Sequence, residues 1–220
     1  MLQSYSLPAA ICRVLFALLG WVSLVLQFFL ACSTGKALGQ PFLQTASNFF
    51  SYFTILTNLL ATLSLSILVA NPRSNAGKFF SRPTVQTAIA GNILIVCCVY
   101  NMILAKLWNP QGAQWLADVL LHTNLPLFYL VYWILFVPKG TLGAGSPLPW
   151  ILYPLAYFLY SLARGAVTGW YPYPFIDATS LGYPLVLRNS FIVLAAFLVV
   201  FYILVLVDRG LRKASPVSPP

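Results

Sequence analysis

Six long apolar stretches, separated by short polar segments, dominate the pattern of this chain. Each is about 19–23 residues long, which is the length a helix needs to cross the hydrocarbon layer of a membrane. They cover residues 9–31, 48–70, 84–106, 115–137, 149–167 and 188–207. Pro154 and several tyrosines make the fifth stretch more amphipathic than the others. The pattern predicts an all-α fold, an integral membrane bundle of six transmembrane helices.

Little chain remains outside these stretches, so the sequence predicts one membrane domain and no soluble one. We expect residues 1–211 to form the six-helix transmembrane domain. Residues 212–220, polar and rich in proline, are expected to be a disordered cytoplasmic tail. The segment "GWYPYPFIDATSLGYP" (169–184) combines aromatic residues and prolines around Asp177. Its composition indicates a semi-rigid cap on the membrane surface.

Composition and charge support a membrane protein and give its orientation. The chain is 60% hydrophobic and only 7% charged, whereas about a quarter of the residues of soluble domains are charged. With six spans, the lysines and arginines fall mostly on the side of the two termini: Arg13, Arg73, Lys78, Arg82, Lys139, Arg209, Arg212 and Lys213, against Lys36, Lys106, Arg164 and Arg188 on the other side. Positive charge collects in cytoplasmic loops, so both termini are predicted to be cytoplasmic, in a multi-pass protein of the cell membrane. The net charge of +9 then reflects topology, and we expect no nucleic-acid partner.

The chain offers little for a metal or a cofactor. Its four cysteines are Cys12, Cys32, Cys97 and Cys98, and none has the spacing of a zinc or redox motif. One histidine and three acidic residues do not supply a convincing set of ligands. We therefore expect neither a metal nor a cofactor. The sequence does not predict an oligomeric state.

Polar residues gather at one depth of the predicted bundle. Thr54 lies about six residues, or roughly 9 Å, from the outer end of the second stretch, and His122 about seven residues, or roughly 10 Å, from the outer end of the fourth. Ser51, Thr57, Asn58, Asn101 and Arg164 fall in the same outer layer, with Asp177 in the cap above. Because polar groups are costly in hydrocarbon, this layer predicts a polar pocket that opens outward.

Within that layer, spacing suggests acyl-transfer chemistry. Asp118 and His122 are four residues apart on one helical face, where the carboxylate can accept a proton from the imidazole. A hydroxyl, an imidazole and an orienting carboxylate are the parts of a nucleophile, base and orienter set, with Thr54 as the hydroxyl. Donors for the oxyanion of such a reaction would be Asn58, Asn101 or Arg164.

Each of these residues also has a structural interpretation. A threonine in a membrane helix often donates its hydroxyl proton to a carbonyl of its own helix. A buried Asp118–His122 pair can be a satisfied structural contact. Arg164 can neutralise Asp118 or Asp177 as an ion pair, and Asp208 can be a charge at the membrane surface.

Three short segments resemble the family of androgen-induced gene products and androgen-dependent TFPI-regulating proteins. They are "FFSYFTILTNLL" (49–60), "HTNLP" (122–126) and "GWYPYPFID" (169–177), and the resemblance extends to helix order and number. Bacterial relatives of this family are predicted six-pass membrane proteins. Its mammalian members are intramembrane threonine hydrolases that cleave fatty acid esters of hydroxy fatty acids. Their threonine and histidine match Thr54 and His122.

The resemblance implies a lipid-ester hydrolase, whose substrate is a membrane lipid or fatty-acyl ester. Thr54 would attack the ester carbonyl, His122 would act as the base, and Asp118 would orient His122. The substrate-binding residues would be Asn58, Asn101, Arg164, Trp170, Tyr173, Phe175 and Asp177, with the aromatic residues 170–175 covering the acyl chain. The alternative is a membrane protein without catalysis that binds a lipid or transports a small solute.

Overall fold

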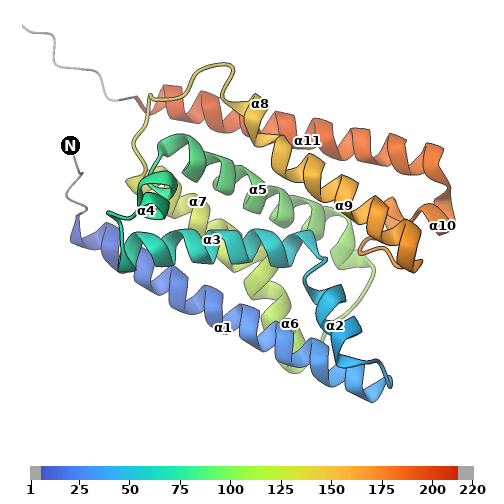
Figure 1. Ribbon diagram of the computed structural model, residues 1–220. Coiled ribbons are helices and arrows are strands. Elements are labelled where there is room, and N and C mark those ends of the chain that lie inside the picture. Colours follow the sequence, from blue (N-terminus) through green and yellow to red (C-terminus); the bar gives the residue numbers. More distant parts are fainter. Residues whose placement is uncertain (1–5, 213–220) are drawn as a thin grey trace, which may run out of the picture.

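The computed structural model of the protein describes residues 6–212, and all regular structure within that range is helical (Figure 1). The elements are α1 (Leu7–Ala37), α2 (Phe42–Phe49), α3 (Phe53–Ala70), α4 (Asn75–Phe80), α5 (Pro83–Met102), η1 (Leu104–Lys106), α6 (Gly112–Val119), η2 (Leu120–Asn124), α7 (Leu125–Phe136), α8 (Pro147–Trp150), α9 (Leu152–Thr168), η3 (Pro174–Ile176), α10 (Ala178–Leu181) and α11 (Tyr183–Gly210). The predicted tail lies outside the described residues, apart from its first residue, Arg212.

Five helices in this range are long and apolar enough to cross a membrane. They are Leu7–Ala37, Phe53–Ala70, Pro83–Lys106, Gly112–Phe136 and Tyr183–Gly210. The fifth predicted stretch is not among them; it forms α8 and the 17-residue α9. The protein is therefore an all-helical membrane protein with five candidate spans.

The long helices lie roughly along one direction, with the small elements at their ends. Figure 1 shows α9 running alongside α11, from the loop after α7 to the segment that contains α10. The start of α1, the short α4 and the end of α11 lie at one end of the bundle. The helices α2 and α10 lie at the opposite end.

The core has a larger part between α1, α3, α5 and α7 and a smaller part around α11. The larger includes the fully buried Phe16, Leu65 and Trp133. Two glycines let helices approach closely. A Cβ atom on Gly20 of α1 would lie 2.2 Å from the Thr62 hydroxyl of α3, and one on Gly91 of α5 would lie 2.4 Å from the Phe201 ring of α11. Small residues at such crossings are typical of membrane bundles, where close packing drives helix association.

The second predicted helix is interrupted. The prediction ran from residue 48 to 70, but α2 ends at Phe49 and α3 begins at Phe53. Tyrosines of α9 bind the connection: Tyr157 donates to the Ser51 carbonyl at 2.8 Å, and the hydroxyls of Tyr160 and Ser51 lie 2.8 Å apart. These contacts account for Tyr157 and Tyr160 of the fifth stretch, whose hydroxyls face the break in the chain.

The last helix also differs from its prediction, which began at residue 188. The helix α11 begins five residues earlier, at Tyr183, with Pro184 in its first turn. Proline is well tolerated there, because the first N–H groups of a helix have no partner within the helix.

At the other end of the bundle, Asp208 binds the loop between α7 and α8. The sequence suggested a charge at the membrane surface, but Asp208 is only 1% exposed. Its Oδ2 atom accepts hydrogen bonds from the backbone N–H groups of Thr141 and Leu142, both at 3.0 Å, and its carbonyl accepts one from Gly140 at 2.9 Å. The carboxylate therefore holds this loop against the end of α11.

In the same loop, Lys139 closes the C-terminal end of α7. Its ammonium group donates to the carbonyls of Trp133 and Val137 and lies 4.1 Å from the centre of the Trp133 ring. Cations are favourable at helix C-termini and over aromatic rings. Burial lowers the pKa of Lys139 from its ordinary 10.5 to about 8, while Asp208 acts in the opposite direction.

We expect Lys139 to make the stability of the protein increase with pH. Between about pH 8 and 10.5 the unfolded chain binds more protons at this group than the folded one, so the free energy of unfolding rises with pH. Allowing for partial exposure, the gain is about 1–2 kcal/mol. Melting temperatures at pH 7.5 and 9.5, in uncharged detergent, should rise less in Lys139→Met than in wild type. The exposed Lys78→Met is the control, and parallel curves for all three proteins would contradict the prediction.

Candidate functional site

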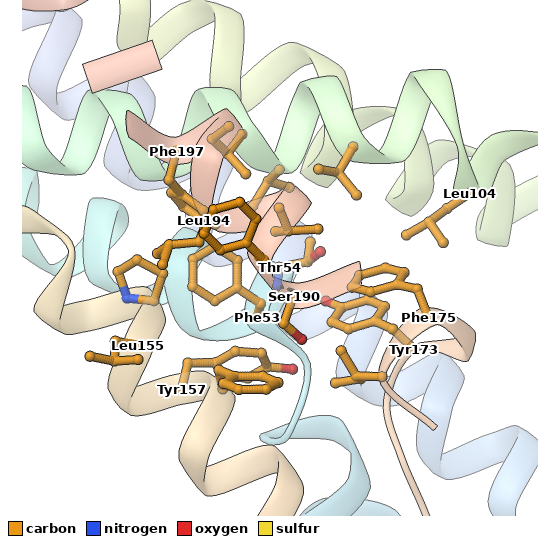
Figure 2. Close-up of a pocket in the computed structure, with 18 of the residues that line it drawn as sticks. Phe53, Thr54, Leu104, Leu155, Tyr157, Tyr173, Phe175, Ser190, Leu194 and Phe197 are labelled. Carbon is orange, nitrogen blue, oxygen red and sulfur yellow. Dashed lines mark hydrogen bonds between the residues drawn. The ribbon is translucent and has the colours of Figure 1, made fainter. Parts of the chain in front are cut away.

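A cavity of about 270 Å³ lies between α3, α5, α9, α11 and the segment around η3. Figure 2 shows Phe53, Tyr157, Tyr173 and Phe175 around Thr54 and Ser190. The other lining side chains are mostly aliphatic or aromatic: Ile95, Val96, Val99, Tyr100, Leu104, Pro154, Leu155, Phe158, Ile176, Leu187, Phe191, Val193, Leu194 and Phe197. The predicted pocket was polar, but this cavity is apolar with a few hydroxyl groups. Such a lining suits an acyl chain.

The cavity reaches the outer surface of the bundle between α9 and α11. Among its lining residues, Leu187 and Phe191 of α11 are 56% and 73% exposed, and Leu155 of α9 is 38% exposed. In a bilayer these side chains would touch lipid. The cavity therefore has a side wall that a lipid chain can approach.

Thr54 lies in the first turn of α3, because the chain breaks just before it. It is 8% exposed and lines the cavity. Its N–H is one of the first groups of a helix, which lack partners within the helix, and it donates to the Tyr173 hydroxyl at 3.4 Å. Burial raises the pKa of Tyr173, so this hydroxyl stays protonated. The Thr54 hydroxyl thus sits at the positive end of a helix dipole, beside a phenol donor.

His122 and Asp118 form the predicted pair on the fourth stretch. The Nδ1 atom of His122 lies 3.2 Å from Asp118 Oδ1 and 3.0 Å from the Asp118 carbonyl. The other carboxylate oxygen accepts a hydrogen bond from Tyr100 at 2.6 Å. The Tyr100 ring stacks on the His122 ring with centroids 3.6 Å apart, and Trp108 donates to the Tyr100 hydroxyl at 2.8 Å. Both of these oxygens lie on the Nδ1 side of the ring, so the tautomer that donates to them from Nδ1 leaves the Nε2 lone pair available.

His122 lies in a π-helical turn, η2, where the chain departs from regular α geometry. Pro126 follows, and it has no N–H for the carbonyls one turn before it. Side chains from neighbouring helices replace that donor. Asn58 of α3 donates to the Leu121 carbonyl at 3.0 Å, and Asn101 of α5 approaches the His122 carbonyl at 3.5 Å.

These contacts give Asn58 and Asn101 a structural role at the π turn. Asn58 is 0% exposed, and its amide also donates to the Thr54 carbonyl at 2.9 Å. Asn101 donates to Thr123 Oγ1 at 3.2 Å. Neither side chain lines the cavity, and binding of substrate or an oxyanion by them stays a prediction. π turns occur often at functional sites, and this one is fixed from both sides.

Thr54 and the His122–Asp118 pair lie at the same level of the bundle but do not line one cavity. One amide nitrogen, Asn58 Nδ2, lies within 3.0 Å of both the Thr54 and the Leu121 carbonyls, which brings residues 54 and 121 together. Tyr100 lines the cavity and stacks on His122, so it connects the two groups. Sequence reasoning missed Tyr100, because a tyrosine in an apolar stretch carries no signal that distinguishes it from core.

The remaining predicted residues divide between the cavity and its surroundings. Tyr173 and Phe175 line the cavity. Arg164 and Trp170 line a separate hollow beside α2, where the guanidinium lies 4.5 Å from the Trp170 ring centre. Asp177 caps α10 and accepts from the N–H groups of Thr179 and Ser180, at 2.9 and 3.2 Å, and from the Ser180 hydroxyl at 2.6 Å. These bonds, led by that of the Ser180 side chain, lower the pKa of Asp177. The suggested ion pair of Arg164 with Asp118 or Asp177 does not occur among the described residues.

Comparison with known proteins gives one partial similarity. The chain is 28% identical over 128 residues to a probable multidrug resistance protein NorM of Haemophilus ducreyi. The similarity covers 56% of this chain and 26% of the NorM protein, so the chain spans about a quarter of its relative. No protein-family model and no solved structure matches the chain.

Proposed function

We propose that this protein is an intramembrane lipid-ester hydrolase with Thr54 as its nucleophile. The observation that carries the proposal is the position of the Thr54 hydroxyl. It lies in the wall of an apolar cavity, and the neighbouring turn η2 holds His122, which Asp118 orients. The resemblance of segments 49–60, 122–126 and 169–177 to the androgen-induced gene product family supports the same chemistry. The substrate is a fatty-acyl ester, of the kind in which a fatty acid esterifies a hydroxy fatty acid.

In the proposed reaction, His122 Nε2 takes the proton of the Thr54 hydroxyl as its oxygen attacks the ester carbonyl carbon. The tetrahedral oxyanion is stabilised by the Tyr173 hydroxyl and by the first N–H groups of α3. The ester C–O bond then breaks, and the leaving alkoxide takes the proton from His122. Water, deprotonated by the same imidazole, then attacks the acyl carbonyl carbon. The bond from that carbon to Thr54 Oγ1 breaks, the imidazole returns the proton to Oγ1, and the acid leaves.

This mechanism requires one side-chain movement. Tyr100 contacts both the His122 ring and the cavity, and it must shift when a substrate carbonyl reaches Thr54. Catalytic hydrogen bonds are often longer without substrate and tighten in the complex.

The protein crosses the plasma membrane six times in this proposal. Both termini lie in the cytoplasm. The helix α9 is the sixth span. At 1.5 Å per residue its 17 residues extend about 25 Å, and α8 lengthens the segment. The lysine and arginine distribution supports this orientation.

Labelling with a fluorophosphonate tests the nucleophile. We expect wild-type protein to be labelled and Thr54→Ala and His122→Ala to lose labelling, because the first lacks the attacking oxygen and the second the base. Ser190→Ala is the matched control: its hydroxyl is in the same cavity, but it donates to the Val186 carbonyl at 2.7 Å. Labelling that survives in Thr54→Ala would sink the mechanism.

The second candidate is a membrane protein that binds a lipid or transports a small solute without covalent chemistry. The stacking of Tyr100 on His122 and the partial similarity to a NorM protein favour it. In that case wild type stays unlabelled, Thr54→Ala changes only the affinity for a lipid, and copurifying lipid identifies the ligand.

A further inference from the structure

The hollow around Arg164 is a second site, distinct from the cavity at Thr54. Its lining contains a cation and four uncharged polar side chains beside three apolar ones, whereas that of the cavity is almost wholly apolar: Pro41, Leu43, Gln44, Ser47, Asn48, Arg164, Thr168 and Trp170. Figure 1 places α2 and the C-terminal end of α9, which contribute these residues, at the end of the bundle away from the two termini. The neighbouring Phe42 and Leu43 are 67% and 79% exposed, as residues in contact with lipid would be.

The Arg164 guanidinium is held in place and keeps unused donors. Its Nη2 atom donates to Asn48 Oδ1 at 2.6 Å and approaches Ser47 Oγ at 3.4 Å. Its Nη1 atom is buried without a hydrogen-bond partner among the described residues. A guanidinium has five donors in a planar fork, which suits the paired oxygens of a carboxylate or phosphate.

No acidic side chain within residues 6–212 pairs with Arg164. The chain has three acidic residues, and each is engaged elsewhere. Asp118 binds His122 and Tyr100, Asp177 caps α10, and Asp208 binds the loop after α7. The described residues therefore supply no carboxylate to this partly buried guanidinium, and an anion from outside the chain would meet no competing one.

One aromatic residue joins the hollow to the cavity. The Tyr52 ring packs edge-on against Trp170 at 5.6 Å and against Tyr173 at 5.8 Å. Trp170 lines the hollow and Tyr173 lines the cavity. An anionic headgroup would bind beside Arg164 on one side of Tyr52, and the apolar chain of the same molecule would enter the cavity on the other side.

We propose that the Arg164 hollow binds an anionic oxygen group, a carboxylate or phosphate, of a membrane amphiphile. Arg164 supplies the charge, Asn48 and Trp170 fix the plane of its guanidinium, and the Gln44 and Thr168 side chains lie in the same hollow. The site does not depend on hydrolysis at Thr54, and its test requires no turnover.

Binding of pyrene-labelled dodecanoic acid and of the matching neutral alcohol tests the site, with energy transfer from tryptophan as the signal. In uncharged detergent at pH 8, wild type should bind the acid at least about tenfold more tightly than the alcohol. One charge-assisted hydrogen bond contributes an affinity difference of about this size. Arg164→Gln should remove this preference and leave alcohol binding unchanged. Arg164→Lys, which keeps the charge without the fork, should retain part of it.

Arg188→Gln is the matched control, because it removes the same charge from an exposed position near the start of α11. It should bind both probes as wild type does. Inorganic phosphate distinguishes the sources of the anion. Displacement of the acid by millimolar phosphate, dependent on Arg164, would show that a free anion suffices; the absence of displacement would show that the chain is needed. Equal binding of acid and alcohol by wild type, or an equal loss of both in Arg164→Gln, overturns the proposal.

Discussion

Asp208→Ala should destabilise the protein by about 2–4 kcal/mol. The substitution leaves the N–H groups of Thr141 and Leu142 without their acceptor, and Leu142 is only 7% exposed. A buried polar group that loses its partner costs about 1–3 kcal/mol, and the partly buried Lys139 loses its nearby negative charge as well. For a chain of this size the melting temperature should fall by roughly 5–15 °C, which differential scanning fluorimetry in detergent will measure.

Asp177→Ala provides the comparison for this result. Asp177 also accepts two backbone N–H groups, those of Thr179 and Ser180, but it does so near the surface, where water replaces the lost acceptor. Loss of such a helix cap costs about 1 kcal/mol. Equal shifts for the two variants would show that burial does not decide the contribution of Asp208.

Asp118→Asn should lower the rate of ester hydrolysis about 100-fold while the protein stays folded. The carboxylate stabilises the imidazolium that forms when His122 takes a proton, and an amide cannot do so. We expect a smaller loss than the ~10⁴ of a buried triad aspartate, because the Asp118 carbonyl, 3.0 Å from Nδ1, still orients the ring. Turnover of a fluorogenic long-chain ester by detergent-solubilised protein gives the ratio.

Tyr100→Phe separates orientation from packing. It removes the hydrogen bond to Asp118 and keeps the ring stacked on His122, so the rate should fall less than about tenfold. If Asp118→Asn hydrolyses the ester as fast as wild type, the carboxylate has only a structural role.

The sequence predicted the helical class, most of the long helices and the Asp118–His122 contact, since each depends on spacing within one segment. Hydrophobic runs predict helices, and positions four apart share a face. The break before Thr54 was missed, because it is held by tyrosines of α9 that lie about a hundred residues further along the chain. An interruption of this kind depends on tertiary contacts, and the local pattern of residues 48–70 gives no sign of it.

Two residues of the predicted polar layer, Asn58 and Asn101, hydrogen-bond to the backbone. Their amides donate to carbonyls near Pro126. A sequence shows that a polar residue in an apolar helix needs a partner. It does not show whether that partner is substrate or backbone, since this depends on which carbonyls a proline leaves without donors.

The π turn before Pro126 gives the fourth span two halves that are out of phase. An α-helix turns by about 100° per residue, and a π turn takes in one extra residue, so the faces before and after it are offset by about that angle. Asp118 can thus face Tyr100 of α5, while Tyr129 and Tyr132, after the turn, face Phe16 and Arg13 of α1. Gaining or losing one residue in this turn would change which neighbour each half faces, although the length of the span would hardly change. In a comparison with relatives, the face on which a residue lies should therefore be worked out separately for the half before the turn and the half after it.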